Sequence, residues 1–501
     1  MKADNCAKAA DEIIKEVKSK GACTKSEADK IKRKIGKEYG LARMISDSEL
    51  YNKSGLDVFR RKPSRSISGV SVVAVMTSPA KCPHGKCVFC PGGVEYMTPQ
   101  SYTGEEPAAL RARRNNYDAY KQVKDRISQY YIIGQIPSKV ELIIMGGTFT
   151  SRSWNYQKNF INDCFNALNN KRTSLKQSQK LNENAKHRCV GLTVETRPDE
   201  ISMKTIKRLL ELGATRVELG VQSLDNKVLK KSMRGHSVND IIRATRLLKD
   251  AGFKINYHMM TNMPGSTIRK DFESFRKAFN DENFRPDMLK IYPTLLIKGT
   301  KLHEMFENKK WKPYTLKQTI SLVAKIKRIC PDYVRIMRVQ RDIPSFKIEQ
   351  DLKNSNLRQL VNNYMKGKRW VCSCIRCREA GRNKGNLSNA NIKIKKYNAS
   401  RGIEYFIEYS DNNNVLFGFI RSRMKNKVLF IRELHVYGKQ AGFGEKGEIQ
   451  HTGIGRRLLY EAEKLGINEI RIISGVGVRG YYRKMGYNLR NNYMSKFLKH
   501  A

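Results

Sequence analysis

The chain of 501 residues is 40% hydrophobic, which provides for about two to four domains with apolar cores. Its 96 lysines and arginines outnumber 47 acidic residues, and the net charge of +49 predicts a polyanionic partner, first of all nucleic acid, with a merely solvated basic surface as the alternative. The sequence contains neither the apolar core of a signal peptide nor a membrane-length apolar run, so we expect a cytoplasmic protein in which the 11 cysteines serve metal or redox chemistry.

Residues 1–65 are predicted to form a short basic helical segment. Apolar residues recur at helical spacing over residues 7–20 and 26–39, and lysines occupy the opposite face of each helix. A polar stretch follows that contains Arg60, Arg61, Lys62 and Arg65. We interpret the segment as a nucleic-acid-binding arm, and the alternative is a solubilising appendage.

Residues 66–335 are predicted to form an α/β domain with a parallel sheet. Runs rich in β-formers occupy residues 70–75, 140–145, 190–195, 216–221, 254–259 and 288–292. Helical patterns between them occupy residues 107–133, 155–169, 201–212, 238–250 and 268–279. Repeated strand–helix units of this length favour a sheet that is either open or curled into a partial (β/α) barrel. The polar residues 171–188 interrupt the pattern, and we expect them to form an exposed, disordered insertion.

The rest of the chain is predicted to contain a linker and a compact α+β domain. The linker, residues 336–390, carries a second cluster of cysteines. Residues 391–501 begin with runs that we expect to pair as antiparallel strands, at 392–397, 404–409, 415–421 and 428–436. The predicted domain is completed by a helix over 455–465, a strand over 469–474 and a short helix near 481–485.

Three cysteines follow the first predicted strand in the pattern C-x4-C-x2-C, at Cys82, Cys87 and Cys90. Soft thiolate ligands at this spacing suit an iron–sulfur cluster or zinc. Three thiolates would leave one iron of a cluster open to a substrate or cofactor. A zinc knuckle completed by His84 is the alternative.

The cysteine pattern and its place at a strand end resemble those of the radical SAM superfamily, although the family's usual spacing is C-x3-C-x2-C. The resemblance implies that the cysteines hold a [4Fe–4S] cluster and that S-adenosylmethionine (SAM) binds its open iron. Later strand ends carry Gly146, Gly147, Glu195 and Gln222, which we expect to contact SAM. The alternatives are an ordinary turn at the two glycines and a structural ion pair between Glu195 and Arg197.

The second predicted site lies in the C-terminal domain. The pattern Q-x-x-G-x-G, starting at Gln450, would place backbone N–H groups at a helix N-terminus, which suits a pyrophosphate. With the preceding strand it resembles the coenzyme A loop of the GNAT acetyltransferases. The resemblance implies coenzyme A contacts by Gln450, Gly453, Ile454, Gly455 and Arg456. It also implies that the strand splays from its neighbour and that the acetyl group lies near Glu433, Leu434, His435 and Val436.

Catalytic residues of this domain follow from the same resemblance. The segment around Tyr481 and Tyr482 is similar to the last GNAT motif, in which a tyrosine hydroxyl meets the thioester sulfur, and we assign that position to Tyr482. Core packing is the alternative for Tyr481. For His435 and Glu433, cross-strand structural roles are weighed against catalysis.

The linker cysteines Cys372, Cys374 and Cys377 form C-x-C-x2-C, a pattern that predicts a structural zinc site. Our candidate for the fourth ligand is Cys330, and free buried cysteines are the alternative.

A radical SAM domain followed by a GNAT domain in one chain resembles the catalytic-subunit family of Elongator, in its archaeal or bacterial-type form. The resemblance extends over nearly the whole chain. The segments that carry it are residues 82–93, 145–149, 195–199, 218–223, 338–344, 432–438, 450–451 and 481–484.

This resemblance implies a tRNA-modifying reaction. A SAM-derived radical would abstract hydrogen from the methyl group of acetyl-CoA, the carbon would add to C5 of the anticodon wobble uridine, and thioester hydrolysis would leave 5-carboxymethyluridine. Residues 1–65 would bind tRNA phosphates, and Lys139 would help hold acetyl-CoA unless it is only a solvated strand-end lysine. The alternatives are a protein lysine acetyltransferase and a non-catalytic tRNA-binding scaffold. The sequence leaves accessory subunits or a homodimer open.

Overall fold

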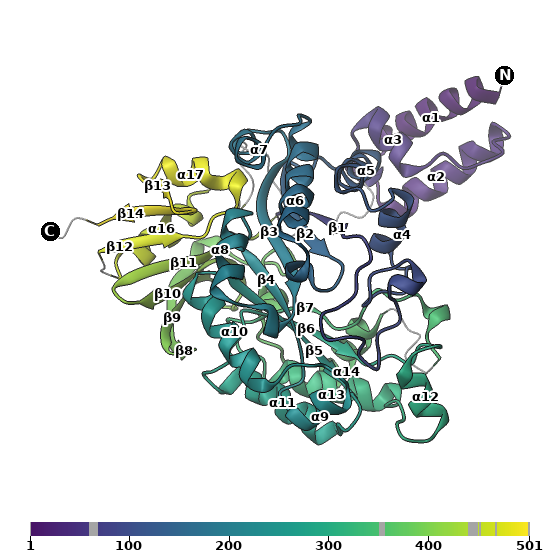
Figure 1. The fold of residues 1–501 in the computed structure, drawn as a ribbon. Coiled ribbons are helices and arrows are strands. Elements are labelled where there is room, and N and C mark those ends of the chain that lie inside the picture. The colour runs from purple at the N-terminus through teal and green to yellow at the C-terminus, as the bar shows by residue number, and fades with distance from the viewer. Residues whose placement is uncertain are drawn as a thin grey trace.

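The computed structural model describes residues 2–59, 69–349, 356–438, 449, 452–465 and 468–498. A small helical body at the N-terminus precedes two seven-stranded sheets. Figure 1 shows the helical body projecting at the upper right and the C-terminal sheet at the left. The predicted order of a basic helical segment, a partial barrel and an α+β domain is confirmed.

The N-terminal body is a bundle with its own core. Its helices are α1 (Lys2–Ser19), α2 (Lys25–Glu38) and α3 (Asp47–Ser54). Thr24 and Ser46 begin α2 and α3 with capping boxes, in which the hydroxyl and a glutamate three residues on satisfy each other's backbone N–H groups. Apolar side chains that include Ile13, Ile31 and Leu50 are buried between the helices. The first two helices match the prediction, whereas α3 has only 8 residues and too short an apolar stripe to be detected.

The first sheet is a half-barrel of parallel strands in the sequential order β1 to β7. The strands are β1 (Ser71–Met76), β2 (Lys139–Met145), β3 (Arg188–Thr196), β4 (Arg216–Gln222), β5 (Lys254–Thr261), β6 (Met288–Pro293) and β7 (Arg335–Arg338). The six predicted strands are present. β7 was not predicted, because 4 residues give no readable periodicity.

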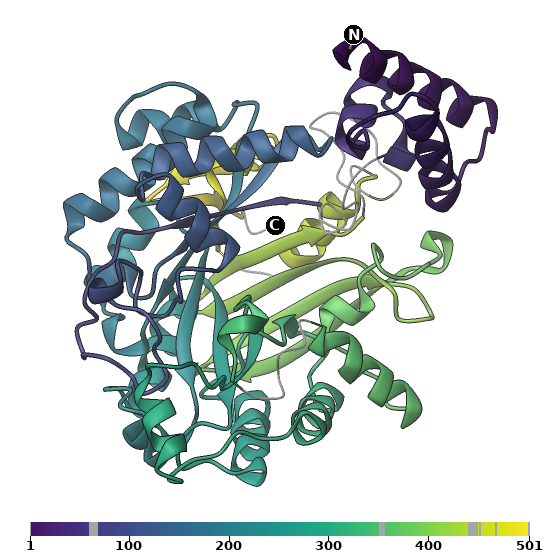
Figure 2. The same ribbon diagram turned by 90° about the vertical axis from the view of Figure 1, so that its right-hand side faces the viewer.

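Helices cover the outside of the half-barrel, as Figure 2 shows. The helices of this part of the chain are α4 (Pro107–Arg114), α5 (Ala119–Ile132), α6 (Trp154–Asn169), α7 (Leu175–Asn182), α8 (Met203–Glu211), α9 (Asn226–Lys231), α10 (Val238–Asp250), α11 (Ile268–Asn280), α12 (Lys301–Glu307), α13 (Leu316–Arg328) and α14 (Leu357–Gly367). Two of them lie at the cavity side, since α4 lines the cavity and α12 packs against the cysteine loop. The predicted helix 107–133 is divided, because Asn116 and Tyr117 adopt positive φ and Asp118 caps a new helix. Among the described residues, no helix combines the length and apolarity that a bilayer crossing requires.

The prediction of a disordered insertion at residues 171–188 is wrong. This segment contains α7, which packs against α6 and the turn at Val476–Val478 and buries the polar side chains of Ser178, Gln179 and Asn182. Ser178 donates to Asn162 Oδ1 at 2.9 Å, and Asn182 Oδ1 accepts from the backbone N–H of Cys189 at 2.7 Å. Amide and hydroxyl groups that have hydrogen-bond partners can be buried without apolar residues. The amino-acid composition of this segment alone therefore led to the wrong prediction.

The second sheet is mixed and has the order β13-β14-β12-β11-β10-β9-β8. The strands are β8 (Asn391–Ala399), β9 (Gly402–Ser410), β10 (Leu416–Lys425), β11 (Val428–Val436), β12 (Glu469–Ile472), β13 (Asn488–Arg490) and β14 (Tyr493–Phe497). The helices are α15 (Ile375–Arg378), α16 (Ile454–Glu463) and α17 (Arg479–Arg483). The four-strand meander was predicted, whereas the short hairpin β13–β14 was not.

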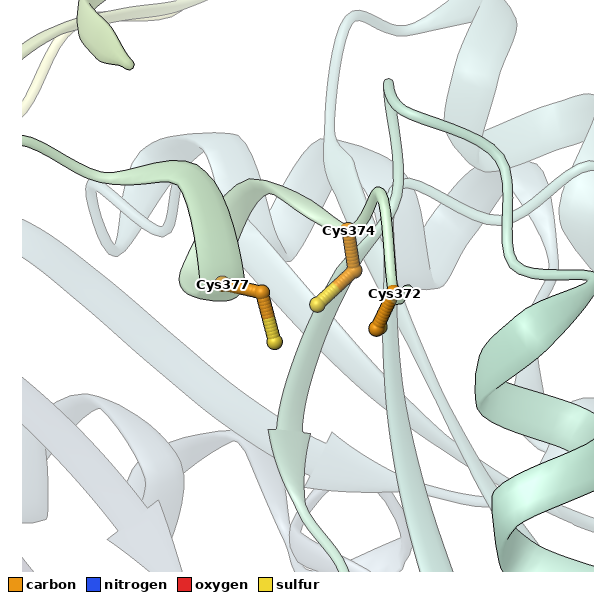
Figure 3. A group of neighbouring side chains, drawn as sticks. All are labelled: Cys372, Cys374 and Cys377. Carbon is orange, nitrogen blue, oxygen red and sulfur yellow. The ribbon is translucent and has the colours of Figure 1, made fainter. Parts of the chain in front are cut away.

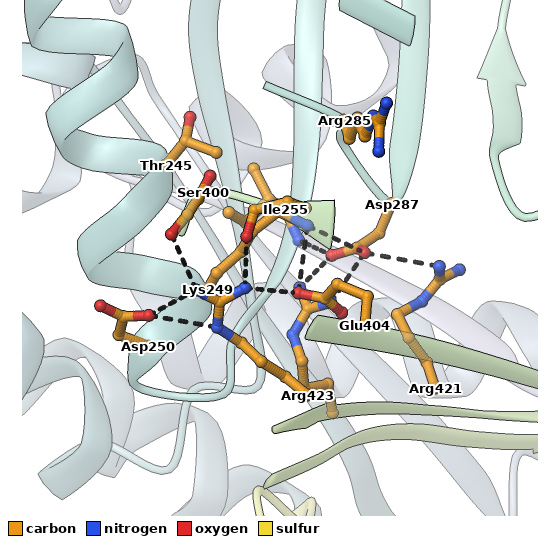
Figure 4. A network of polar contacts seen from close by, with 12 residues as sticks. Thr245, Lys249, Asp250, Ile255, Arg285, Asp287, Ser400, Glu404, Arg421 and Arg423 are labelled. Atoms are coloured by element: carbon orange, nitrogen blue, oxygen red, sulfur yellow. Dashed lines mark hydrogen bonds and ion pairs between the residues drawn. The ribbon is translucent and has the colours of Figure 1, made fainter. Parts of the chain in front are cut away.

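A buried network of charges joins the second sheet to the half-barrel (Figure 4). Arg432 of β11 donates to Asp287, which precedes β6, at 2.9 Å and to Glu404 of β9 at 2.7 Å. Lys249 of α10 lies 3.4 Å from Glu404, and Arg423 of β10 lies 3.0 Å from the same carboxylate. Each acid thus faces at least two bases, which is the condition for burying charges without a large penalty. The network fixes the second sheet against the amino ends of the half-barrel strands.

Candidate active site

The loop after β1 brings Cys82, Cys87 and Cys90 to the carboxyl ends of the half-barrel strands. The three side chains line a cavity of about 290 Å³ inside the half-barrel. Gly147, Glu195 and Gln222 line the same cavity, and Gly146 lies beside it. The structure therefore brings the predicted cysteines and the predicted SAM-contacting residues together around one space.

Positive and polar groups surround the cysteine sulfurs. His84 Nε2 lies 3.0 Å and Arg234 Nη1 lies 3.1 Å from Cys87 Sγ. The Cys90 thiol, and next to it the positive charge of Arg234, hold the pKa of Cys87 well below its usual range in spite of burial. The same contact with Cys87, together with burial, raises the pKa of Cys90. Thiolate is the form that binds metals, so the loop favours ligation at Cys87.

Several buried polar atoms around the cysteines lack hydrogen-bond partners among the residues that the structure describes. They are Nδ1 of His84, Oε1 of Gln222, Nε of Arg234 and both ring nitrogens of His236. Buried polar groups of this kind are rare in native proteins and are costly unless something binds them. Three thiolates with such a shell fit an iron–sulfur cluster together with a polar cofactor.

Gly146 and Gly147 differ in what their backbones face. A Cβ on Gly146, which has a φ of 124°, would lie 2.0 Å from Thr77 Oγ1, so this glycine is needed for the close packing of the first two strand ends. A Cβ on Gly147 would meet only Ser101 Oγ, at 3.8 Å. Gly147 is thus the one of the pair that leaves room for a ligand in the cavity.

Glu195 faces the cavity and accepts a hydrogen bond from the Tyr102 hydroxyl at 2.8 Å. The alternative of an ion pair with Arg197 does not occur in the described structure, because Arg197 pairs with Asp199 at 2.8 Å. Glu195 thus lines the cavity with the Tyr102 hydroxyl as its hydrogen-bond donor.

Three charged or titratable residues deeper in the cavity were not predicted. Glu218 of β4 accepts from His258 Nε2 of β5 at 2.6 Å and pairs with Lys290 of β6. Burial opposes ionisation of Glu218, but Lys290 and His258 hold its pKa well below the usual range. Burial and then Lys290 lower the pKa of His258, which is therefore neutral.

These residues could have been found in the sequence. Each is a polar side chain within an otherwise apolar strand, in V-E-L-G-V, Y-H-M-M and L-K-I-Y. Glu195, Glu218 and His258 have ligand atoms within 4.8 Å of one another, as in a metal site. Lys290 and Arg216 already balance the charge of Glu218, however, so this cluster does not call for a cation.

The second predicted site is assembled at the N-terminus of α16. Gly453 is the N-cap residue, and its φ of 91° is one that glycine adopts without a steric penalty. A Cβ on Gly455 would lie 3.1 Å from the Tyr481 hydroxyl, 3.7 Å from Val436 and 4.0 Å from Leu434. Gly455, Tyr481, Val436 and Leu434, all predicted site residues, therefore lie together. Ile454 is buried next to them, and Arg456 is exposed beside Tyr481. Gln450 lies outside the described residues.

The two tyrosines occupy different environments. Tyr481 is 38% exposed, and burial raises its pKa to about 12. Tyr482 is packed in the apolar core of the second sheet against Tyr487. Its hydroxyl is thus less accessible to a thioester than that of Tyr481, and the geometry favours Tyr481 for the position that we had assigned to Tyr482.

The last residues of strand β11 face α16 on one side of the sheet and the half-barrel on the other. Its pairing with β12 covers Val428–Ile431, and the strand continues to Val436 beyond the last paired residue, in keeping with the predicted splay. Leu434 and Val436 face α16. Glu433 lies 3.5 Å from Arg421, and the ring of His435 packs on Phe419 and Tyr437, toward the half-barrel. The latter contacts support cross-strand roles for both residues.

Lys139 lies at the amino end of β2, away from the cysteine loop. It is the partner of Arg188 in the β2–β3 register, and Gly477 of the C-terminal domain packs closely on Arg188. Lys139 is thus near the junction of the two sheets, as a contact to acetyl-CoA from the half-barrel side would require.

The linker cysteines converge at the start of α15 (Figure 3). The sulfurs of Cys372, Cys374 and Cys377 all lie within 4.8 Å of one another. Cys330 does not belong to this group, and its thiol donates instead to the backbone oxygen of Pro331 at 3.7 Å. The structure therefore gathers three of the four predicted zinc ligands and not the fourth.

Known proteins match this chain over most of its length. The Radical SAM superfamily matches residues 76–278, and the Radical_SAM C-terminal domain matches residues 286–367. A tRNA uridine(34) acetyltransferase of Methanocaldococcus infernus is 46% identical over 97% of this chain and 98% of its own length. Elongator complex protein 3 of Homo sapiens is 37% identical over 94% of this chain and 93% of its own length.

A solved structure agrees with the sequence matches. Archaeal Methanocaldococcus infernus Elp3 with an N-terminal deletion (1–46) superposes with a TM-score of 0.77 at 42% identity, over 86% of this chain and 100% of that one. Membership of the radical SAM superfamily implies a [4Fe–4S] cluster and SAM. The chain belongs to the family of radical SAM acyltransferases that includes the tRNA uridine(34) acetyltransferases and Elongator complex protein 3.

Proposed function

We propose that this enzyme joins the methyl carbon of acetyl-CoA to C5 of the wobble uridine of tRNA, and that thioester hydrolysis then frees coenzyme A and leaves 5-carboxymethyluridine in the tRNA. One methyl hydrogen would pass to 5′-deoxyadenosine, C5 would lose its hydrogen as a proton, and SAM, cleaved to methionine and 5′-deoxyadenosine, would serve as the oxidant. The observation that carries the proposal is the occurrence in one chain of a cysteine-lined half-barrel cavity and a helix N-terminus that faces a tyrosine hydroxyl. The first suits radical chemistry and the second suits an acyl thioester.

In the half-barrel, Cys82, Cys87 and Cys90 would hold the cluster, and the open iron would bind SAM beside Gly147. When bound, these cofactors supply a radical that is able to remove hydrogen from an unactivated methyl group. Glu195 and Gln222, which line the cavity, would contact SAM. The deep wall made by Glu218, His258 and Lys290 would orient the reacting groups and exclude water.

In the second sheet, the N-terminus of α16 would bind the pyrophosphate of coenzyme A. Gly453, Ile454, Gly455 and Arg456 would line that contact, with Gln450 in the preceding loop. Leu434 and Val436 would offer backbone groups to the pantetheine arm. The Tyr481 hydroxyl would meet the thioester sulfur, and Lys139 would reach the ligand from the half-barrel.

For tRNA, charge supports the proposal. The net charge of +49 suits a polyanion, and α2 of the N-terminal bundle carries six lysines and arginines against three acidic residues. Arg60, Arg61, Lys62 and Arg65 lie outside the described residues. A wobble uridine would have to be turned out of its stack before its C5 could enter the half-barrel cavity.

Nucleoside mass spectrometry tests the reaction. Unmodified tRNA is incubated anaerobically with the protein, SAM, a low-potential reductant and acetyl-CoA, and a lysine-rich peptide is supplied in a parallel reaction. We expect 5-carboxymethyluridine in the tRNA and none from Cys90→Ser. Acetylated peptide with unmodified tRNA would instead support the lysine acetyltransferase, and binding of tRNA with neither product would support a scaffold.

We also propose that Cys372, Cys374 and Cys377 bind a structural zinc ion whose fourth ligand is not Cys330. The three sulfurs converge, and Ile375 between them donates to the backbone oxygen of Val334 at 3.0 Å, which ties the site to β7. Elemental analysis should find one zinc per chain in the wild type and in Cys330→Ser, and none in Cys374→Ser. Equal zinc loss from Cys330→Ser would restore Cys330 as the fourth ligand.

A further inference from the structure

Arg234 brings a buried positive charge to the cysteine loop. The residue is 6% exposed, Nη1 lies 3.1 Å from Cys87 Sγ, and Nη2 donates to the backbone oxygen of Gly220 at 2.8 Å. Nε is also buried and has no hydrogen-bond partner in the described part of the chain. Arg234 and Cys87 are 147 residues apart in sequence, so the fold of the half-barrel creates this contact.

The contact distinguishes Cys87 from the other two cysteines. Cys87 Sγ is within 3.1 Å of both Arg234 and His84, whereas Cys82 Sγ lies 3.5 Å from the Thr148 hydroxyl. A guanidinium does not lose its proton in proteins, so the charge beside Cys87 is permanent. Cys87 is 2% exposed, and solvent therefore screens this charge poorly.

We propose that Arg234 is a positioning residue that raises the reduction potential of the iron–sulfur cluster by donating a charge-assisted hydrogen bond to the Cys87 sulfur. The inference rests on the proposed ligands Cys82, Cys87 and Cys90. Reduction adds one negative charge to the cluster. A fixed positive charge and an N–H donor at a ligand sulfur stabilise that added charge more than they stabilise the oxidised state. The low dielectric of the buried site strengthens the effect.

A purely structural role makes a different prediction. Through its bonds to Cys87 and Gly220, Arg234 links the cysteine loop to the end of β4, next to Gln222. The residue could have this structural role alone. Loss of this structural link would lower the retention of the cluster or the stability of the protein, but it would leave the reduction potential of each retained cluster unchanged. The reduction potential, measured per cluster, therefore separates tuning from tethering.

The experiment uses the full-length protein, reconstituted anaerobically with iron and sulfide. Wild type, Arg234→Met, Arg234→Gln and Arg234→Lys are compared by iron content and by an EPR-monitored redox titration without SAM. We expect a more negative midpoint potential in Arg234→Met, a smaller shift in Arg234→Gln, which keeps a donor, and the smallest in Arg234→Lys, which keeps the charge. Arg111→Met is the matched control, because Arg111 is also a buried arginine that donates to a backbone oxygen, that of Ala74 at 2.7 Å. Its potential should equal that of the wild type.

Two results would overturn the inference. One is a wild-type potential in clusters retained by Arg234→Met and Arg234→Gln. The other is loss of iron from all three Arg234 variants, since the residue would then serve retention and not tuning. These results differ from a failure of the proposed ligand set, in which the wild type itself would assemble no cluster, and from a failure of the proposed reaction, in which a normal cluster would yield no modified uridine.

Discussion

Glu218 shows how one buried carboxylate organises the half-barrel cavity. It is 1% exposed, and it contacts His258, Lys290 and Arg216 from three strands and Asn256 at 3.1 Å. Because Glu218 is ionised and can only accept, the proton of the neutral His258 is assigned to Nε2. The other ring nitrogen, Nδ1, is then an acceptor, on a residue that lines the cavity.

Replacing Glu218 by Gln should destabilise the protein by about 3–5 kcal/mol, because Lys290 and Arg216 would remain buried with one counter-charge fewer. Urea unfolding measures this change. The control is Glu273→Gln on α11, whose exposed pair with Arg276 should be worth less than about 1 kcal/mol. Similar losses in the two variants would show that the Glu218 cluster is not an energetically coupled unit.

Tyr481 and Tyr482 provide a second test at this scale. Tyr481→Phe should slow cleavage of the acetyl-CoA thioester by about 10²-fold, since a positioned proton donor is lost, without a change in folding. Tyr482→Phe should retain most of the activity, because Tyr482 is part of the apolar core. Release of free coenzyme A in the presence of tRNA is the measurement. The reverse ranking of the two variants would restore the assignment to Tyr482.

Among the elements, α10 contributes an unusual lysine to the junction of the two sheets. Burial lowers the pKa of Lys249 to about 8, although Glu404 and Asp287 oppose this effect. In the unfolded chain the same amine has its ordinary pKa of 10.5. Between pH 8 and 10.5 the unfolded state therefore binds a proton that the folded state has released. Stability rises with pH in this window and falls back as the pH drops through 8.

The comparison of wild type with Lys249→Met isolates this contribution. From pH 7.5 to pH 10, the free energy of unfolding of the wild type should increase by about 2 kcal/mol relative to that of the variant. Lys325→Met, at an exposed position on α13, is the control. Parallel stability curves for wild type and Lys249→Met would mean that the amine keeps an ordinary pKa at the junction.

The elements also show what the sequence can predict. Long periodic runs gave β1 to β6 and the meander β8 to β11, because alternating or continuous apolar residues report burial directly. Helix α7 was not predicted, because its buried side chains, such as Ser178 and Asn182, are polar and hydrogen-bonded and therefore give no apolar pattern. The cysteine loop could be recognised from local spacing. Arg234 could not, because its contact with Cys87 joins segments that are 147 residues apart in sequence.

At the scale of the whole molecule, the two candidate sites belong to different sheets that share a fixed junction. The cysteine loop lies at the carboxyl ends of the half-barrel strands, and the second sheet is held at their amino ends by Asp287 and Arg432. The cavity extends along the half-barrel from the cysteines to Arg216, at the start of β4. A reaction that uses both sites needs this relative placement, and the buried charges maintain it.

Removing residues 1–68 should separate tRNA binding from the two chemical sites. The bundle has its own core, so a chain beginning at residue 69 should keep its iron content and its affinity for acetyl-CoA. Its affinity for tRNA should fall about tenfold or more, with a shallower dependence on salt, because fewer phosphates are neutralised. Filter binding at several salt concentrations measures both quantities. An unchanged salt dependence would place the tRNA contacts elsewhere on the molecule.

The central claim is that one acetyl group is handled by both sites, and isotope transfer tests it most directly. The enzyme is supplied anaerobically with tRNA, SAM, reductant and acetyl-CoA deuterated in the acetyl methyl group. We predict 5-carboxymethyluridine that retains two of the three methyl deuterons and 5′-deoxyadenosine that has gained one. Modified uridine without deuterium, or deuterated acetyl groups transferred intact to another acceptor, would contradict the claim.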